Sequence, residues 1–333
     1  MRKEIPPEAP WGAANSLLFD GVTWESWLRE HVQDPAARHA FEIWNTLVLG
    51  VQPARVSLLQ VLWYYSAVGG WEEHLKGETY RFVGGAAELP LRMAAELGER
   101  VHLACPVRVI DQSDPKEVVV KAQDLQLRAR RCIVAMSPSD ARYIEFRPQL
   151  PARREHLHRQ FMSVSLIKSQ AVYEEPFWRD EGLSGICLSD LDAASFCWDN
   201  SPPDGAPGVL LTFVYHLPEF SPMGITPRIE DDAEERKTAV LSAFAEYFGP
   251  KALDPIGWVE KNWIEEPYTY GCTGVYPPGM LTTAGPVLKD AIDRIHWGSA
   301  ENGTRWGGGA WMNGGVDRAE ELAREVGAAI DAS

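Results

Sequence analysis

The sequence predicts a mixed α/β fold organised in about two domains. Helical and strand-like segments alternate along most of the chain, and the apolar run at residues 132–136 is typical of a strand buried on both faces of a sheet. At 333 residues the chain is longer than one domain of about 150 residues. Its 45% hydrophobic and 24% charged residues are typical of a globular protein.

Helices are predicted in the first third of the chain. Thr23 is suited to cap a helix that begins at Trp24. Apolar residues recur at helical spacing over 56–68, and Gly69 follows as a helix stop. A further helix is predicted over 89–97, where apolar side chains recur every four residues.

Strands follow, and two more helices complete the pattern. The strand-like segments span residues 101–103, 106–110, 117–121, 127–136, 164–173 and 209–215. An amphipathic helix is predicted over 233–248, where Gly249 and Pro250 stop it. The last predicted helix closes the chain with an apolar stripe between Val316 and Ile330.

The charge and the cysteines exclude several classes of protein. Lys+Arg 32 against Asp+Glu 47 gives a net charge of −15, which repels nucleic acid and anionic membrane surfaces. The most apolar stretch is shorter than the roughly 20 residues that span a bilayer, so we expect no membrane anchor. Five cysteines at scattered spacings indicate neither a zinc site nor a disulfide framework, which favours a reducing compartment, the cytoplasm.

Three features could carry chemistry, each with a structural alternative. Lys168 interrupts an apolar strand, so it either reaches solvent at a sheet edge or faces a polar pocket. Cys272 lies in a loop rich in glycine, proline and aromatics, where it is either a buried structural cysteine or an exposed nucleophile. The glycines of 307–315 precede the last helix, where backbone N–H groups can approach a ligand or form a plain loop.

Nine short motifs occur along the chain in a fixed order. They are Leu62–Tyr64, Phe82–Gly85, Pro106–Ile110, Phe146–Pro151, Leu166–Lys168, Glu175–Arg179, Leu253–Pro255, Trp263–Glu266 and Tyr276–Gly279. Each motif is weakly specific alone. In this order, and over nearly the whole chain, they resemble the flavin-containing monoamine oxidase family.

The resemblance implies a two-domain FAD-linked amine oxidase fold. It consists of an incomplete Rossmann-like FAD domain, expected at 78–137 and 256–333, and a substrate domain with a mixed sheet and helices, expected at 1–77 and 138–255. The implied activity is oxidative deamination of a small-molecule amine by hydride transfer to flavin N5. Molecular oxygen is the implied electron acceptor, and hydrogen peroxide the implied product.

The resemblance also implies roles for seven residues. Lys168 falls on the lysine that holds a water against flavin N5, and Cys272 on the cysteine to which the monoamine oxidases proper attach FAD covalently. Many relatives bind FAD without that bond, so both modes of binding stay open. Trp311 matches one aromatic wall of the cage beside the flavin. The other implied FAD contacts are Val107, on the adenine side, and Trp263, Glu301 and Met312, which line the flavin.

The sequence departs from the family pattern around this cage. Thr273 stands where the monoamine oxidases carry the second cage aromatic, so Tyr270 or Tyr276 would have to replace it. The segment 307–310 is two residues longer than its equivalent in the family. These departures favour a site that is altered or inactive.

The family's phosphate-binding module is not found in this sequence. No three glycines have the spacing G-x-G-x-x-G, so we expect a βαβ unit of ~30 residues or more to be missing. The sheet it would complete is then expected to expose an apolar edge, to be covered by a second chain or by a homo-oligomer. Three functions stay open: one half of a split FAD-dependent amine oxidase, a truncated inactive or regulatory relative that does not bind FAD alone, and an FAD-dependent amino-acid or polyamine oxidase.

Overall fold

The computed structural model divides the chain into two compact units. It describes residues 1–77, 79–164, 166–190, 192–215, 232–263, 265–269, 271–272, 274–303 and 311–332. Unit 1 comprises 1–20, 59–161 and 279–333, and unit 2 comprises 21–58 and 162–278. Both units are therefore assembled from segments distant in the sequence. The domain limits expected from the sequence stay a prediction.

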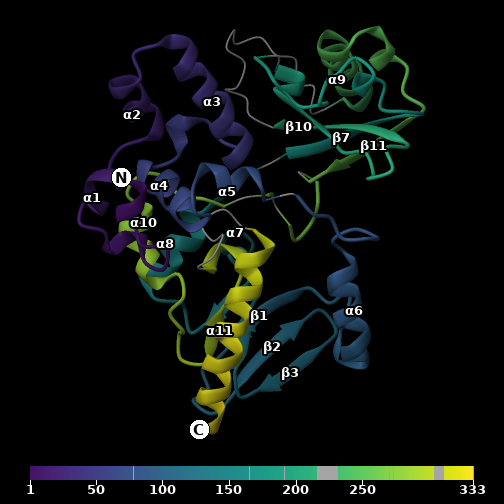
Figure 1. The fold of residues 1–333 in the computed structure, drawn as a ribbon. Helices are drawn as coiled ribbons and strands as arrows, with labels where there is room; N and C mark the ends of the chain where they lie inside the picture. Colours follow the sequence, from purple (N-terminus) through teal and green to yellow (C-terminus); the bar gives the residue numbers. More distant parts are fainter. Residues whose placement is uncertain are drawn as a thin grey trace. The chain divides into compact units, whose positions relative to one another are not determined.

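Unit 2 is built on a five-stranded antiparallel sheet covered by one long helix. The strand order is β11-β7-β10-β9-β8, and Figure 1 labels three of these strands, β10, β7 and β11. The strands are β7 (Leu166–Tyr173), β8 (Cys187–Leu188), β9 (Phe196–Asp199), β10 (Gly208–Tyr215) and β11 (Gly257–Asn262), and a separate pair is formed by β6 (Met162–Ser163) and β12 (Gly274–Val275). The helices are α2 (Trp24–His31), α3 (Pro35–Leu49) and α9 (Ala233–Phe248).

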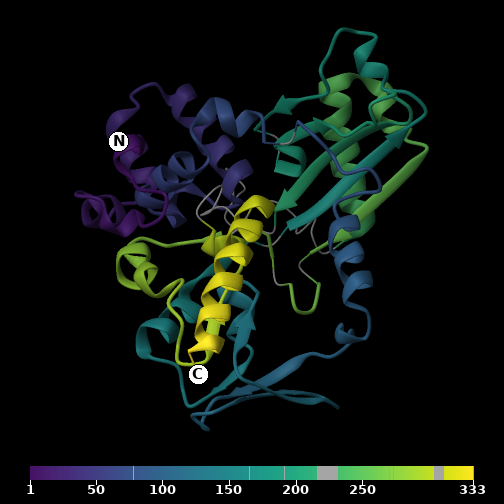
Figure 2. The same cartoon turned by 60° about the horizontal axis from the view of Figure 1, so that its bottom comes forward.

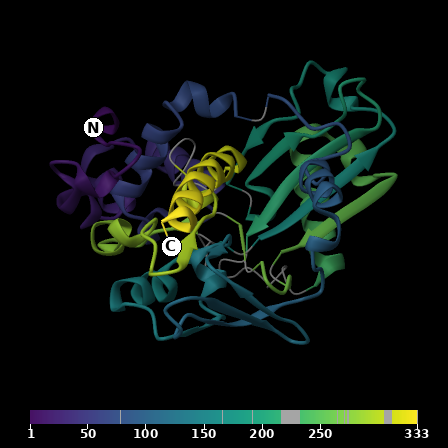
Figure 3. The same ribbon diagram turned by 90° about the horizontal axis from the view of Figure 1, so that it is seen from below.

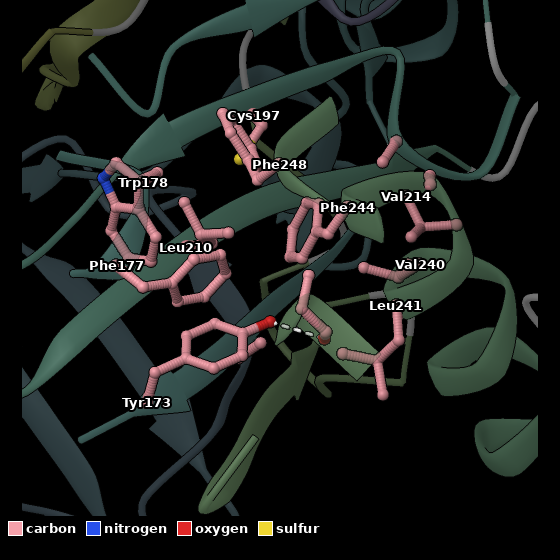
Figure 4. Packing of buried hydrophobic residues seen from close by; sticks show 14 of the residues in the cluster. Tyr173, Phe177, Trp178, Cys197, Leu210, Val214, Val240, Leu241, Phe244 and Phe248 are labelled. Carbon is pink, nitrogen blue, oxygen red and sulfur yellow. Dashed lines mark hydrogen bonds between the residues drawn. The ribbon is translucent and has the colours of Figure 1, made fainter. Parts of the chain in front are cut away.

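The alternation of side chains along β7 explains how α9 packs. Ile167, Ala171 and Tyr173 are buried on one face of the sheet, where they pack with Phe244 and Phe248 of α9 (Figure 4). The Tyr173 hydroxyl donates to the carbonyl of Ala252 at 2.9 Å, so this buried polar atom is satisfied. The intervening residues of β7 point to the opposite face and are only half-buried.

A buried ion pair fastens α9 to the sheet. The Arg236 guanidinium, from α9, donates through Nε to Glu260 Oε2 on β11 at 2.9 Å, and a second hydrogen bond joins its Nη2 to Oε1. Ser169 Oγ of β7 donates to the same carboxylate at 3.1 Å. The Arg236 side chain is only 4% exposed and that of Glu260 15%. One carboxylate therefore links three elements.

Unit 1 contains two small sheets and most of the helices. A four-stranded sheet has the order β3-β2-β1-β5, with its antiparallel part seen at the bottom of Figure 2. Its strands are β1 (Val107–Asp111), β2 (Val118–Ala122), β3 (Gln126–Ala129) and β5 (Glu145–Arg147), and β4 (Cys132–Val134) pairs in parallel with β13 (Ile295–Trp297). The helices are α1 (Ser16–Asp20), α4 (Leu58–Ala67), α5 (Trp71–Leu75), α6 (Glu88–Leu97), α7 (Pro138–Ala141), α8 (Ala152–Gln160), α10 (Met280–Ala284) and α11 (Met312–Asp331).

In the sheet formed by β4 and β13, the two strands differ in how far they are buried. On β13, His296 Nδ1 lies 2.7 Å from Glu325 of α11, the yellow helix that ends near the C-terminus in Figure 3. On β4, Val134 is buried but Ile133 is 45% exposed. In the part of the chain that the structure describes, no other strand pairs with β4. This edge therefore presents unpaired backbone groups beside an apolar side chain.

Several predicted elements are confirmed, and three details are wrong. Thr23 caps α2 by accepting a hydrogen bond from the Ser26 backbone at 3.0 Å, and α9 has the predicted limits. Residues 101–103 form no strand, and the predicted strand 127–136 is two strands in different sheets. The exposure of Ile133 shows that β4, the second of these two strands, is not buried on both faces. No helix in the described ranges is long and apolar enough to cross a membrane.

His158, expected from its charged neighbours to be a surface residue, is buried instead. On α8, Arg154, Leu157 and His158 share one side of the helix at spacings of three and four residues. Arg154 lies 3.6 Å from the centre of the Trp297 ring and donates through Nε to His158 Nε2 at 3.0 Å. Burial and the nearby Arg154 charge lower the His158 pKa from 6.5 to about 3. His156 is exposed, as expected.

The burial of His158 predicts a pH-dependent stability. Between pH 6.5 and pH 3 the unfolded chain binds a proton at this residue and the folded chain does not, so the free energy of unfolding falls as the pH falls. The slope from this group is at most about 1.4 kcal/mol per pH unit. Urea denaturation at a series of pH values should show a smaller slope in His158→Gln than in the wild type. The exposed neighbour provides the control, His156→Gln; equal slopes in all three proteins would contradict the prediction.

Candidate functional site

Lys168 lies on β7, an inner strand of the unit 2 sheet, on the face opposite α9. It pairs with Phe213 of β10 on one side and Lys261 of β11 on the other. Its side chain is half-buried, and Nζ lies 5.7 Å from the centre of the Phe213 ring. The alternative that Lys168 reaches solvent at a sheet edge is therefore wrong, because β7 has a neighbouring strand on each side.

Trp263 continues β11 past its last residue and lies close to Lys168. Its backbone N–H donates to the carbonyl of Leu166 at 3.2 Å, which extends the pairing with β7. Lys261 Nζ lies 5.3 Å from the centre of the Trp263 ring and forms an ion pair with Glu266. Trp263 is half-buried. Since Lys261 is directly opposite Lys168, the indole and both ammonium groups share one face of the sheet.

Cys272 is held beside the residues that lead into β7. Its backbone N–H donates to the carbonyl of Val164 at 2.8 Å, and its side chain is exposed. Gly271 has φ +147°, and a Cβ there would lie 2.5 Å from the Val164 oxygen, so only glycine allows this approach. The exposed thiol agrees with the nucleophile alternative and not with a buried structural cysteine.

Tyr215 lies on the same face of the unit 2 sheet as Lys168, since it is two residues after Phe213 on β10. Tyr215 ends β10 opposite Leu166, and its hydroxyl donates to the carbonyl of Leu47 at 3.2 Å. Burial raises the pKa of this tyrosine, and the negative charge of a Cys272 thiolate raises it further. Three of the predicted residues, Lys168, Trp263 and Cys272, are therefore gathered around the start of β7.

A second group of predicted residues surrounds the beginning of α11 in unit 1. Glu301 lies in a short 3-10 helix and is only 7% exposed, and its carboxylate has no hydrogen bond to any residue within the described ranges. This short helix packs against the first turn of α11, where a Cβ on Gly303 would lie 2.3 Å from Gly314 Cα. Trp311 precedes the helix and is half-buried, and Met312 is 49% exposed.

Val107 does not join this second group. It is the first residue of β1, pairs with Ala122 of β2, and packs against the core beneath that sheet. Of the two tyrosines considered as substitutes for the missing cage aromatic, Tyr276 is fully buried. Tyr270, Thr273 and the long glycine segment 307–310 lie outside the described residues.

Trp311 contacts two residues, Tyr64 and His74, that were not predicted from the sequence as site residues. The indole Nε1 donates to the Tyr64 hydroxyl at 3.1 Å, and that hydroxyl lies 2.8 Å from His74 Nδ1. Tyr64 belongs to a motif of the family resemblance, so a signal for it existed. Nothing in the sequence connects His74 with Trp311.

Comparison with known proteins identifies the family. The model of the flavin containing amine oxidoreductases matches residues 2–327. The chain belongs to this family. It is 31% identical to human amine oxidase [flavin-containing] B over 98% of its own length and 63% of the human protein. It is also 31% identical to bovine amine oxidase [flavin-containing] A, with a coverage of 98% and 62%.

Solved structures show the same fold. Cyclohexylamine oxidase from Brevibacterium oxydans IH-35A matches with a TM-score of 0.87 and 27% identity, over 99% of this chain and 72% of that one. Wild-type putrescine oxidase bound to putrescine matches with a TM-score of 0.88 and 28% identity, over 98% and 72%. These matches confirm the predicted family, the mixed α/β amine oxidase fold and FAD as the family's cofactor.

The chain is shorter than these relatives. It spans 62% to 71% of the length of the first curated relatives that it matches. Its activity, its substrate and the roles of its site residues therefore belong to the proposal that follows.

Proposed function

We propose that the protein is an FAD-dependent amine oxidase that deaminates a small-molecule amine. The observation that carries this proposal is the gathering of Lys168, Trp263 and Cys272 around the start of β7, since Lys168 was predicted from a different segment from the one that contains the other two. When bound, FAD would accept a hydride at N5 and pass its electrons to O2, which yields hydrogen peroxide. No nucleic-acid partner is expected, because the net charge is −15.

The residues of each unit, taken separately, suit a flavin in their chemical character. The exposed Cys272 thiol is available for a covalent bond, and the half-buried Trp263 offers an apolar surface. Lys168 would hold a water through its ammonium, three donors on a long stem. In unit 1, the buried Glu301 carboxylate is suited to accept hydrogen bonds from a polar ligand. Met312 would cover flavin surface, and Trp311 would orient the substrate amine. Val107 would lie near the adenine.

Polyamines are the second substrate class that the observations favour. The putrescine oxidase that shares the fold is named for a diamine, and the negative charge of this chain would attract a polycation. An amino acid, which carries a carboxylate, would gain less from that charge. Measuring the hydrogen peroxide released with putrescine, with a monoamine and with an amino acid distinguishes these substrate classes. No peroxide from any of them, in protein that holds FAD, would contradict the proposed oxidase activity.

The proposal predicts a flavin spectrum that depends on Cys272. Chain purified after expression with FAD should absorb in the visible range, and the colour should remain with the protein after acid precipitation. In Cys272→Ala the colour should move to the supernatant, because the thioether bond cannot form. Cys105→Ala, a change at a half-buried cysteine, is the control. Colour lost equally from the wild type would show non-covalent binding, and a chain that stays colourless with added FAD would contradict independent FAD binding.

We further propose that unit 1 binds a second chain that carries a nucleotide-binding βαβ unit, or a second copy of itself. Support comes from α6, which has no buried residue and exposes Leu91 by 63% and Met93 by 56%. The unpaired edge of β4 supports the first partner. A cytoplasmic location stays a prediction, which cell fractionation would test.

The α6 surface predicts that the isolated chain self-associates. Sedimentation velocity should give a species larger than 37.1 kDa as concentration rises, and Leu91→Glu with Met93→Glu should shift it toward the monomer. Leu253→Glu, a change at an exposed leucine of unit 2, is the control. A polypeptide with the G-x-G-x-x-G unit should suppress self-association if it is the natural partner. A wild-type chain that stays monomeric and does not bind that polypeptide would contradict both partners.

A further inference from the structure

Two cysteines face each other at the edge of the unit 2 sheet. Cys187 of β8 is the register partner of Cys197 of β9, the two strands run antiparallel, and both cysteines are free thiols. Residues directly opposite each other in such a pair project their side chains from the same face of the sheet. The packing agrees, because Cys187 lies against the buried cluster that contains Cys197, which is labelled in Figure 4.

The strand pairing sets a separation that a disulfide can span. The Ser189 N–H donates to the Ser195 carbonyl at 2.8 Å, which continues the pairing of β8 with β9 two residues beyond the cysteines. Opposite residues of an antiparallel pair have Cα atoms about 4.5–5.5 Å apart. A disulfide accommodates Cα separations of roughly 4.4–6.8 Å. Rotation of the two side chains can therefore bring the sulfurs together without a change of strand register.

The two sulfurs differ in their access to solvent. Cys197 is fully buried, with 0% of it exposed, whereas Cys187 is half-buried. The neighbours of Cys187 along the chain, Ile186 and Leu188, are 53% and 47% exposed. β8 is the last strand of its sheet, and no further strand pairs with it in the part of the chain that the structure describes. A small oxidant from solvent therefore reaches Cys187 first, and Cys197 is the thiol directly opposite.

The surroundings of the pair make it slow to react at neutral pH. Burial raises the pKa of the Cys187 thiol. Burial also raises the pKa of Cys197, and the charge of a Cys187 thiolate raises it further, which agrees with the proximity of the two sulfurs. The other titratable groups around the pair are Asp190, Asp199 and Tyr247. Because the thiolate is the reactive form, oxidation should be faster in mildly alkaline solution.

We propose that Cys187 and Cys197 are a peroxide-sensitive modification site that forms a cross-strand disulfide. Hydrogen peroxide oxidises the Cys187 thiol to a sulfenic acid and releases one water. The Cys197 sulfur then attacks the Cys187 sulfur, and the sulfenic hydroxyl leaves with the Cys197 proton as a second water. The two thiols thus lose two hydrogen atoms, and the peroxide is reduced to water. The inference rests on the proposed function only for the source of the peroxide, which amine oxidation releases.

The bond fastens the edge strand β8 to the rest of the sheet. It closes the hairpin between Cys187 and Cys197, which restricts the unfolded chain and so stabilises the folded one. Thiol reductants restore the two thiols, since disulfide exchange is reversible. In a reducing compartment the pair therefore stays reduced until peroxide is formed.

Mass spectrometry of the full-length chain tests the bond without any enzyme activity. Trypsin cuts after lysine and arginine, and neither occurs between Arg179 and Arg228, so one peptide holds Cys187, Cys197 and no other cysteine. The reduced chain is treated with hydrogen peroxide at mildly alkaline pH, and the remaining thiols are blocked with iodoacetamide. This peptide should lose two hydrogen atoms and take up no iodoacetamide, and dithiothreitol should reverse the change. A peptide that still takes up iodoacetamide at both cysteines overturns the proposal.

Two variants separate the roles of the two sulfurs. In Cys197→Ala the sulfenic acid of Cys187 has no opposing thiol, so it should persist and react with dimedone. In Cys187→Ser the buried Cys197 should stay reduced and take up no dimedone; labelling there overturns the order of oxidation. Cys105→Ala, a change in unit 1, is the matched control and should form the bond as the wild type does. If Cys197→Ala does not fold, the wild type and Cys187→Ser, a change at a half-buried position, still decide.

Urea denaturation measures the consequence for stability. The peroxide-treated chain should unfold at a higher urea concentration than the reduced chain, and Cys187→Ser should show no such difference. A midpoint that does not rise in the oxidised wild type overturns the stabilising role of the bond.

An amine substrate in place of added peroxide tests the link to the proposed function. In FAD-loaded protein, amine and O2 should produce the same disulfide, and catalase should prevent it. Peroxide that is released from the amine without forming the bond overturns this link. If no amine is oxidised, the proposed function fails, and the experiment with added peroxide alone decides whether Cys187 and Cys197 are a modification site.

Discussion

Lys168→Met is expected to lower the turnover of FAD-loaded protein by on the order of 10²-fold, the usual contribution of a side chain that assists proton movement. Methionine keeps an unbranched apolar stem beside Phe213 but removes the ammonium, so the sheet is preserved while the donors to a bound water are lost. Stopped-flow absorbance of the flavin, reduced by amine and then mixed with O2, separates the two half-reactions. The loss is expected in reoxidation, where the lysine-held water would act.

Lys261→Met is a suitable control for this prediction. Lys261 occupies the same face directly opposite Lys168, but its ammonium is paired with Glu266 and lies over Trp263. We expect it to change turnover much less. Equal losses in the two variants would indicate a general effect of positive charge on this face, and an unchanged rate in Lys168→Met would remove the role proposed for this residue.

Arg236→Leu is expected to lower the free energy of unfolding by about 3–5 kcal/mol, because it leaves the largely buried Glu260 carboxylate without its cation. Only the hydrogen bond from Ser169 would remain on that carboxylate among the described residues. Urea denaturation followed by far-UV circular dichroism measures the change. The double variant Arg236→Leu with Glu260→Leu should recover most of the loss, because no charge is then left buried.

An exposed ion pair of the same unit is the control for this result. Arg29 and Glu25 of α2 pair at 2.7 Å, and their side chains are 68% and 32% exposed. Arg29→Leu should therefore lower the free energy of unfolding by no more than about 1 kcal/mol. A similar small loss in Arg236→Leu would show that the buried pair contributes little to holding α9 on the sheet.

The fold could be predicted wherever local signals were sufficient. The limits of α9 follow from its amphipathic pattern and from Gly249, both local in the sequence. The division of residues 127–136 into two strands could not be predicted, because β3 pairs with β2 while β4 pairs with β13, which lies some 160 residues later. His158 was missed because its charged neighbours concealed a helical spacing of buried residues.

The candidate site was predictable only through the family resemblance. Lys168, Trp263 and Cys272 lie up to 104 positions apart, and only strand pairing brings them together. The contact of Trp311 with Tyr64 and His74 depends on how α4, α5 and the start of α11 pack. Such packing leaves no periodic signature, so a single sequence does not reveal it.

The contact between Gly271 and Val164 has a consequence for protein engineering. The thiol of Cys272 is aimed by the main chain, because the residue before it has no side chain and can lie against a neighbouring carbonyl. If a cysteine alone were introduced into a related protein after a residue bulkier than glycine, its thiol would have a different position and orientation. If Cys272 binds FAD covalently as proposed, the element to transfer is the dipeptide Gly271-Cys272.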